Sequence, residues 1–303
     1  MPNEKIAAIA YEAQQLGCKC AADEPLSAYT TFKIGGKCEL MVFINSHESL
    51  SQLVKSANAA GVKYMVLGNG SNVLFSDDGY SGVIFLMGHD FSDISVSDNK
   101  IIASAGAMLS KVCRTALDSS LCGMEFAWGI PGTVGGAVYM NAGAYGGEMK
   151  DIVAAVTCLT PSGDIVTYQK DELDFGYRHS RFKESGEIVL SAEYNLAKGD
   201  YDEIKSKMDE LMNRRKSRQP LEYPSAGSAF KRPEGTFAGL VIEESGLKGY
   251  KVGGAQISQK HANFIINLGG ATACDVLTLV SDVKRIVKEK TGFSLECEIE
   301  FVD

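Results

Sequence analysis

Two arginines and a histidine lie close together at Arg178, His179 and Arg181, between the aromatic residues Tyr177 and Phe182. Arginine binds carboxylates and phosphates through charge-assisted hydrogen bonds. A cation beside a carbonyl or carboxylate also stabilises negative charge that develops there. The segment therefore predicts an anion clamp or a group that polarises a substrate. A solvated loop in front of a strand is an equally good interpretation, and under either we interpret His179 as a loop residue rather than a base.

Two serines stand in a second segment of interest, residues 218–231, which two prolines and a glycine make stiff. We therefore expect the loop to hold Ser225 and Ser228 in defined positions, rather than to leave them as ordinary solvated side chains. Ser228 could donate a proton only if a neighbour such as Lys231 tunes it. An acyl nucleophile is disfavoured, because no GxSxG elbow surrounds either serine. From composition alone, an ordinary loop remains the favoured interpretation.

The end of the chain alternates between apolar and acidic side chains and predicts one strand over residues 294–302. One face would carry Leu295, Cys297, Ile299 and Phe301, and the other Glu296, Glu298 and Glu300. The simplest interpretation is a solvated polar face. A carboxylate at a strand end can equally be a general acid. Periodicity does not show which of the three glutamates would have that role.

Glycine is concentrated in two stretches of the chain, and in the shorter one Ser71 and Asn72 add side-chain donors. Eight of the 32 glycines fall within residues 123–147, around the single tryptophan, Trp128. A shorter run, Gly68-Asn69-Gly70-Ser71-Asn72, follows a predicted strand and matches neither a Walker loop nor the Rossmann fingerprint. Successive amides in such turns can bind an anion. The two stretches predict a cradle for a large phosphorylated ligand such as a dinucleotide, with tight loops between buried strands as the alternative.

Hydrophobic periodicity and capping residues predict the elements that hold these segments. Asn3 is a possible cap of the first helix, and Asp200 with Glu203 forms a capping box for the fourth, which is the candidate domain boundary. The predicted helices cover residues 4–16, 46–61, 108–121, 201–217 and 272–291. The predicted strands cover 39–44, 64–68, 83–87, 94–96, 101–104, 152–160, 164–169, 187–195, 263–269 and 294–302. The order strand, helix, strand, glycine loop over 39–72 is typical of an α/β nucleotide-binding unit.

Composition narrows the class of protein. The chain has 303 residues, enough for about two domains. Its net charge of −8 disfavours a nucleic-acid partner, and the basic run at 214–218 suits a small anion better than a duplex. No apolar run approaches the ~20 residues that span a bilayer, and the N-terminal residues do not resemble a secretory signal. The eight cysteines lack zinc spacing. We therefore expect no metal site, no membrane partner, and reduced thiols in the cytoplasm.

Several motifs in a fixed order resemble a known family. They are Tyr29–Gly36, Leu67–Leu74, Gly129–Ala137, Asn141–Ala144, Tyr177-Arg178, Ser225–Ser228 and Leu295–Ile299. In this combination and order they are similar to the UDP-N-acetylenolpyruvoylglucosamine reductases, flavoenzymes of peptidoglycan precursor synthesis. The resemblance covers nearly the whole chain.

The resemblance implies an α+β protein with an FAD-binding fold of the vanillyl-alcohol-oxidase (PCMH) type, followed by a smaller α+β substrate-binding domain. The FAD-binding region would span 1–197, with two subdomains and the PCMH-type part from about 29. The C-terminal domain would span 198–303, with its last strand able to return to the FAD region. FAD would bind non-covalently, since residues 33–37 lack a histidine for attachment. The residues implied to bind it are Gly68, Asn69, Gly70, Ser71, Asn72, Val73, Pro131, Gly132, Thr133, Gly135, Gly136, Ala137, Asn141 and Gly143.

The resemblance also implies a reaction. NADPH would reduce the flavin, and the enolpyruvyl ether of UDP-N-acetylenolpyruvoylglucosamine would take the hydride to give UDP-N-acetylmuramate. Arg178 and Glu298 would stabilise the enolate, and Ser228 would protonate the neighbouring carbon. This reverses the interpretation of Ser228 and Glu298 from composition alone.

The chain departs from part of the family in two ways. It lacks the insertion that places a tyrosine over the substrate, because only a few residues separate Phe182 from Ile188. Arg232 stands where some members carry asparagine. We expect Arg214, Arg218 and Lys231 to contact the uridine diphosphate instead, in a monomeric enzyme.

Two alternatives stay open at this point. One is an FAD-linked oxidase or dehydrogenase of the same fold that acts on a hydroxy acid or alcohol, in which Arg178, Ser228 and Glu298 would have no clear role. The other is a protein that binds a nucleotide without turnover.

Overall fold

The structure, a computed structural model, describes residues 4–303 in two compact units, each with its own hydrophobic core. Unit 1 holds the chain up to Ala22 together with Glu39–Asn69 and Gly82–Arg214, and unit 2 holds Asp23–Cys38, Gly70–Ser81 and Arg215–Asp303. The predicted cap Asn3 lies outside the described residues. The predicted domain limit between residues 197 and 198 stays a prediction.

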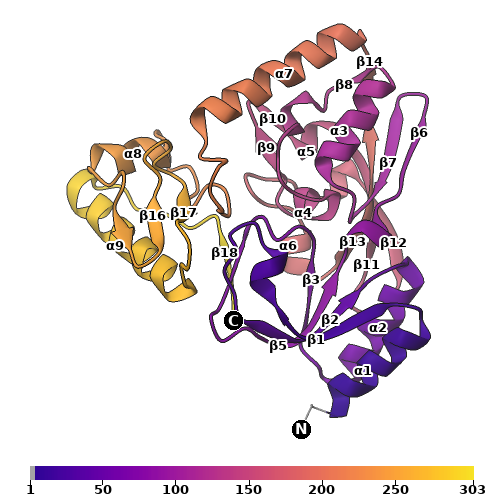
Figure 1. Ribbon diagram of the computed structural model, residues 1–303. Helices are drawn as coiled ribbons and strands as arrows, with labels where there is room; N and C mark the ends of the chain where they lie inside the picture. The colour runs from indigo at the N-terminus through magenta and orange to yellow at the C-terminus, as the bar shows by residue number, and fades with distance from the viewer. Residues whose placement is uncertain (1–3) are drawn as a thin grey trace. The chain divides into compact units, whose positions relative to one another are not determined.

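The first part of unit 1 contains two helices and most of a four-stranded sheet, three of whose strands have end residues assigned to unit 2. The sheet has the order β1-β2-β5-β3, and β3 runs parallel to β5. Its elements are α1 (Glu4–Gln15), β1 (Lys19–Pro25), β2 (Lys37–Phe43), α2 (His47–Ala60), β3 (Tyr64–Leu67) and β5 (Tyr80–Leu86). Helix α2 agrees with the predicted range 46–61, because Ser46 caps its start and Gly61, whose φ of 62° favours glycine, ends it. Helices α1 and α2 pack against each other beside the sheet (Figure 1).

The second part of unit 1 is an antiparallel five-stranded sheet with the order β12-β11-β13-β7-β6. Its strands are β6 (Ile94–Ser97), β7 (Lys100–Ser104), β11 (Val153–Leu159), β12 (Ile165–Gln169) and β13 (Ile188–Asn195). All five match predicted strands to within a few residues. Helix α4 packs against β13 and β7, so one core holds the glycine-rich segment that contains α4.

The remaining elements between these sheets and unit 2 are mostly short. They are η2 (His89–Phe91), α3 (Leu109–Asp118), β8 (Leu121–Cys122), η3 (Glu125–Ala127), α4 (Val134–Tyr139), β9 (Gly143–Ala144), β10 (Gly147–Glu148), α5 (Met149–Ile152), η4 (Lys170–Glu172), α6 (Phe182–Ser185), β14 (Ala197–Lys198) and α7 (Tyr201–Arg218). The helices α3 and α7 are the longer elements of this set. Asp200 caps α7 as predicted, because its Oδ1 accepts hydrogen bonds from the amides of Asp202 and Glu203 at 2.9 and 3.0 Å.

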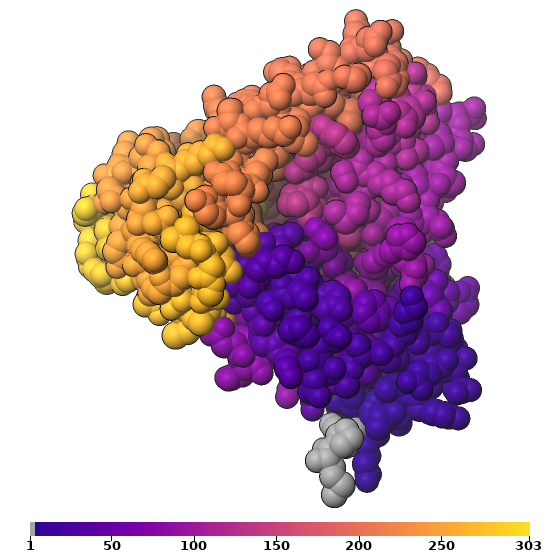
Figure 2. Space-filling view, in the orientation of Figure 1, coloured from indigo at the N-terminus to yellow at the C-terminus, as the bar shows by residue number. Residues whose placement is uncertain are grey.

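Unit 2 is built around a three-stranded sheet, β15-β16-β17, against which α9 packs together with α8. Its elements are η1 (Leu26–Tyr29), β4 (Val73–Phe75), α8 (Ala238–Glu244), β15 (Lys251–Val252), β16 (Ala255–Ile257), β17 (Ile265–Asn267), α9 (Ala273–Thr291) and β18 (Glu300–Val302). The segment from α8 to α9, coloured orange to yellow, forms a closely packed body (Figure 2).

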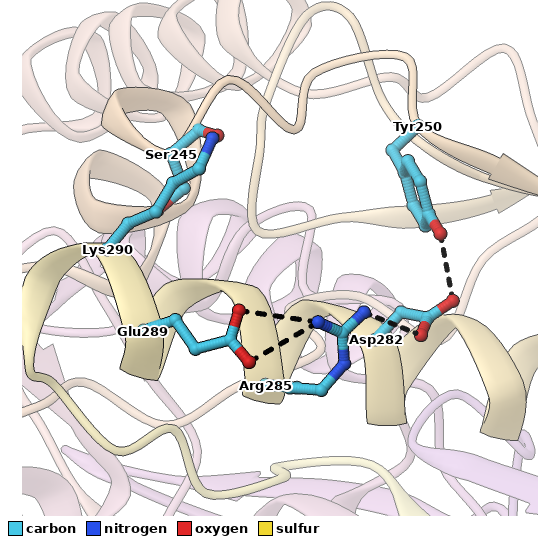
Figure 3. A network of polar contacts seen from close by, with 6 residues as sticks. All are labelled: Ser245, Tyr250, Asp282, Arg285, Glu289 and Lys290. Carbon is cyan, nitrogen blue, oxygen red and sulfur yellow. Dashed lines mark hydrogen bonds and ion pairs between the residues drawn. The ribbon is translucent and has the colours of Figure 1, made fainter.

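A chain of polar contacts ties the loop around β15 to α9 (Figure 3). The hydroxyl of Tyr250 donates to Asp282 at 2.8 Å, and Arg285 lies between Asp282 and Glu289 at 3.5 and 3.3 Å. Lys290 donates to the carbonyl of Ser245 at 2.8 Å. These contacts fix the exposed side of the helix while its apolar side enters the core.

The predicted strand over 294–302 is wrong in its length. Only Glu300–Val302 form a regular strand, β18, which runs parallel to β4. The preceding residues lie in a loop with one isolated bridge, Phe230 to Cys297. Phe301, predicted on the apolar face, is 46% exposed. The regular strand is interrupted because the segment changes its pairing partner within a few residues, from the Phe230 region to β4.

Among residues 4–303, no helix combines the length and the apolar character needed to cross a membrane. In that same part of the chain, all eight cysteines are free thiols and no group of three potential ligands could hold a metal ion.

Candidate active site

The turn after β3 contacts the glycine-rich segment in unit 1. The side-chain amide of Asn69 donates to the carbonyl of Pro131 at 2.7 Å. A Cβ on Gly68 would lie 2.4 Å from Oγ1 of Thr133, so only glycine fits there. The structure therefore brings parts of the two predicted cradles together, although they lie 62 residues apart in the sequence.

The next residues of the same turn belong to unit 2. Gly70 has a φ of +56°, and a Cβ on it would lie 2.3 Å from the carbonyl oxygen of Tyr29. The amides of Asn69, Gly70 and Ser71 have no protein acceptor among the described residues. Consecutive free amides in a glycine turn suit an anion. This turn therefore fits the diphosphate of a dinucleotide such as FAD.

The glycines at the start of α4 have two different roles. Gly135 donates its amide to Ala105 at 2.8 Å, and a Cβ on it would lie 3.0 Å from that of Ala105, so it serves close packing. Gly136 is exposed, and a Cβ on it would meet nothing nearer than Oγ1 of Thr133 at 3.9 Å. No neighbour demands glycine at 136, which leaves bare backbone for a ligand to approach.

Other predicted cradle residues are engaged within the protein. Ala137 and Asn141 donate their amides to Thr133 and Val138, and Gly143 pairs with Glu148. Gly132 accepts a hydrogen bond from Leu109 through its carbonyl, and Val73 pairs with Glu300 in β18. These residues shape the loops, and their contact with a cofactor stays a prediction.

Arg178 lies in a tight turn with backbone strain. Its φ is +54°, a conformation that residues other than glycine adopt rarely and at a cost. Gly176 and His179 close the turn by exchanging two backbone hydrogen bonds of 3.0 and 3.2 Å. The side chain of Asn141 also donates to the carbonyl of Gly176 at 2.8 Å. Strain that the surroundings hold in place is typical of functional turns.

The neighbouring Arg181 has a structural environment, so the structure does not support a clamp of two arginines. Arg181 pairs with Glu187 at 3.0 Å and donates to the carbonyl of Glu172 at 2.9 Å. Its guanidinium also stacks 3.5 Å from the ring centroid of Tyr168. His179 lies 3.3 Å from Asp174 at the edge of the loop. Arg178 is left as the candidate for contact with a substrate.

The Arg181–Glu187 pair leads to a prediction about stability. The Glu187 side chain is only 6% exposed and accepts hydrogen bonds from Arg181 and from Tyr168, at 3.0 and 2.7 Å. Burial raises the pKa of the Glu187 carboxyl. The hydrogen bonds that the carboxylate accepts, among them those from Tyr168 and Arg181, have the larger effect, so the pKa is lowered overall. Glu187→Gln should therefore lower the free energy of unfolding at pH 7 by about 1–3 kcal/mol.

The pH dependence of this effect follows from the direction of the shift. A lowered folded-state pKa contributes stability above the unfolded value, about 4.3, and that contribution is lost as the pH falls through the folded-state pKa. Urea melts of wild type and Glu187→Gln at pH 7 and pH 3 test this. The gap between them should narrow at pH 3, and an equal gap at both values would contradict the account.

The segments that carry Ser228 and Glu298 lie side by side in unit 2. The amide of Glu298 donates to the carbonyl of Ala229 at 2.9 Å, and the amide of Lys231 donates to that of Glu296 at 2.8 Å. The side-chain amide of Asn72, in the glycine turn, donates to the carbonyl of Glu298 at 3.1 Å. Ser228, Glu298 and the glycine turn are thus neighbours, although they lie far apart in the sequence.

The serine loop is fixed from two directions. Thr31 accepts from the amide of Ser225 and donates its hydroxyl to the carbonyl of Ser225, at 3.2 and 2.7 Å. The side chain of Asn263 bonds both the amide and the carbonyl of Phe230 at 3.0 and 2.9 Å. Sequence reasoning missed Asn263, because nothing in its neighbourhood distinguishes it from an ordinary strand asparagine.

The three predicted uridine-diphosphate contacts are cationic side chains in different settings. Arg214 and Arg218 are exposed on α7, and Arg214 lies 5.1 Å from the ring centroid of Tyr145 within unit 1. Lys231 forms a short ion pair with Glu296 in unit 2. Their contact with a substrate stays a prediction.

Comparisons with known proteins match both parts of the chain. Residues 38–169 match a family model described as an FAD binding domain, and residues 219–302 match the C-terminal domain of UDP-N-acetylenolpyruvoylglucosamine reductase. The UDP-N-acetylenolpyruvoylglucosamine reductase of Clostridium novyi is 49% identical over 274 residues, which cover 90% of this chain and 89% of the relative.

Two further relatives agree over more of the chain. The reductase of the same name from Caldanaerobacter subterraneus is 47% identical over 284 residues, which cover 94% of both chains. The crystal structure of UDP-N-acetylenolpyruvylglucosamine reductase from Thermus caldophilus is similar with a TM-score of 0.80 at 39% identity. That likeness covers 94% of this chain and 99% of the Thermus protein.

Proposed function

The chain belongs to the family of UDP-N-acetylenolpyruvoylglucosamine reductases, and we propose which of its residues carry out the steps of that reaction. It is an FAD-dependent enzyme of peptidoglycan precursor synthesis that uses NADPH. The resemblance seen in the sequence is confirmed, and so is the FAD-binding fold followed by a smaller C-terminal part. This identity favours the reductase over the oxidase and over a protein without turnover.

The proposed cofactor site uses the backbone of the two glycine stretches. The free amides of Asn69, Gly70 and Ser71 would hold the diphosphate of FAD. Within unit 1, the bare backbone at Gly136 is a further surface that the cofactor could approach. The chemistry that bound FAD supplies is hydride transfer from NADPH to the alkene of the substrate. The chain carries no histidine in residues 33–37 that would attach the cofactor covalently.

The proposed catalytic residues stabilise the negative charge of the enolate and supply the proton that the substrate takes up. When a hydride adds to one alkene carbon, the electron pair moves onto the neighbouring carbon and the carboxylate attached to it. Arg178 would neutralise the charge that builds up there. Glu298 would assist as a hydrogen-bond donor, which a carboxyl group can be only while it keeps its proton. Ser228 would then give its proton to the neighbouring carbon, which completes the reduction.

The observation that supports this division of roles is the pairing of the Ser228 and Glu298 segments. The amide of Glu298 donates to the carbonyl of Ala229, the residue after Ser228, so the backbone segments that carry Ser228 and Glu298 are adjacent. Asn72 links Glu298 to the glycine turn that would hold the cofactor. We further propose that the cationic side chains of Arg214, Arg218 and Lys231 contact the uridine diphosphate, in a monomeric cytoplasmic enzyme.

Anaerobic absorbance spectroscopy tests the function. Purified protein should be yellow, NADPH should bleach it, and the colour should return only when UDP-N-acetylenolpyruvoylglucosamine is added. UDP-N-acetylglucosamine, which lacks the alkene, is the matched control and should leave the protein bleached. Rapid recolouring by oxygen alone would favour an oxidase, and protein without flavin colour even after incubation with FAD would contradict both enzymes.

A further inference from the structure

Asn141 is a fully buried polar side chain, and one of its hydrogen bonds reaches the turn that carries Arg178. It is 0% exposed. Its Nδ2 donates to Oε2 of Glu148 and to the carbonyl of Gly176, both at 2.8 Å. Its Oδ1 accepts from the amide of Lys150 at 2.9 Å. Protein groups therefore occupy both donors and the acceptor of this amide.

The chemistry of the site requires asparagine. Its φ is +42°, a left-handed conformation that asparagine and aspartate tolerate better than other side chains. Aspartate would lose both donors. It would also place a second carboxylate beside Glu148, which already lies 3.0 Å from Nζ of Lys150. Only asparagine combines the backbone conformation with this set of partners.

The far end of the network is the turn that carries Arg178. Gly176, which accepts from Asn141, exchanges two hydrogen bonds with His179, and Arg178 between them has a φ of +54°. The buried hydroxyl of Ser180 anchors the next residue by donating to the carbonyl of Tyr139 at 2.8 Å. Because a strained turn persists only where its surroundings hold it, the bond from Asn141 bears directly on the Arg178 backbone.

We propose that Asn141 is a positioning residue for Arg178 rather than a contact to FAD. Its side chain joins the loop after α4 to the turn at 176–179, and so fixes the backbone from which the side chain of Arg178 extends. Its catalytic consequence rests on the proposed role of Arg178, whereas its structural part, the support of the turn, does not.

Two variants separate the hydrogen bonds from the backbone conformation. Asn141→Gly keeps the left-handed backbone and loses all three side-chain bonds. Asn141→Asp keeps the shape and the acceptor and loses the donors, and it serves if the glycine variant does not fold. Asn99→Ala is the matched control, because Asn99 donates one side-chain bond of 3.1 Å to Leu196 within the same unit.

Hydrogen exchange of the protein without added substrate tests the structural part. Peptides that cover 174–181 should exchange about tenfold faster in Asn141→Gly, the factor expected for one lost hydrogen bond. They should be unchanged in Asn99→Ala. Unchanged exchange in both Asn141 variants would overturn the proposal whatever their activity, and leave the proposed function standing.

Half-reaction kinetics tests the catalytic part. In Asn141→Gly, the affinity for FAD and bleaching by NADPH should stay within about twofold of wild type, while recolouring by the substrate slows about 10- to 100-fold, as for a misplaced catalytic group. In an Arg178→Ala background, Asn141→Gly should slow recolouring by less than about a further threefold, because both changes act through one group. Additive effects, or loss of FAD binding, would overturn the proposal. An unimpaired Arg178→Ala enzyme would instead contradict the proposed role of Arg178.

Discussion

Replacing Ser228 by alanine should slow the return of flavin colour on addition of substrate by about 10²–10⁴-fold, the usual range for a general acid. Bleaching by NADPH should stay within about twofold of wild type, since that step needs no proton from Ser228. The expectation follows from where Ser228 lies. It is half-buried, forms a bridge with Phe264, and stands next to Ala229, whose carbonyl binds the amide of Glu298.

Ser225→Ala is the matched control for this variant. Ser225 lies in the same loop, but its backbone is held by Thr31 and its hydroxyl accepts a long hydrogen bond of 3.5 Å from the amide of Gly227. Stopped-flow absorbance should show both half-reactions of Ser225→Ala within about threefold of wild type. If Ser228→Ala slowed both half-reactions equally, Ser228 would have a structural role and not that of a proton donor.

The longer helices and the strands of the antiparallel sheet were predictable from local signals, whereas elements such as β1, α4 and α8 were not predicted. The predicted helix limits Ser46 and Gly61 and the predicted cap Asp200 each lie at a helix end in the structure. Capping depends on a few adjacent residues, so it can be seen without knowing the tertiary structure. The five strands of the antiparallel sheet could also be predicted from local signals, because their apolar runs are bounded by turn residues.

The final strand shows where local patterns fail. Alternation over 294–302 predicts a single strand, but the segment pairs first with residues near Phe230 and then with β4. A change of partner is a tertiary event, and it leaves no mark on the periodicity. The two compact units also draw on distant parts of the chain, such as Asp23–Cys38 and Arg215–Asp303 in unit 2. No composition shift in the sequence marks that division.

The sequence identified the segments that make up the candidate site, but it did not show which role each residue has there. Arg178 and Arg181 look alike in the sequence, and only the partners Glu187 and Tyr168 show that Arg181 is structural. Asn141 was assigned to the cofactor site because the resemblance to the family implied it. Its burial and its bond to Gly176 favour a different role. Physical roles of this kind depend on the hydrogen-bond partner, which spacing does not reveal.

Replacing Arg178 by alanine should slow substrate reduction by about 10²–10³-fold, the usual loss when one group that stabilises a developing anion is removed. The reason is electrostatic, since the enolate places negative charge where no other proposed catalytic residue is cationic. Alanine at φ +54° adds little strain beyond that of arginine, so the folded state should persist. The affinity for FAD and bleaching by NADPH should remain close to wild type.

Two comparisons make the Arg178 result specific. Arg178→Lys keeps the charge but loses the planar fork, so it should recover only part of the lost rate. His179→Ala changes the adjacent side chain, which lies at the loop edge beside Asp174, while its backbone still bonds Gly176. It should therefore stay within about threefold of wild type. If His179→Ala and Arg178→Ala were equally impaired in single-turnover recolouring, the integrity of the turn would explain the loss, and the guanidinium would not be the group that stabilises the enolate.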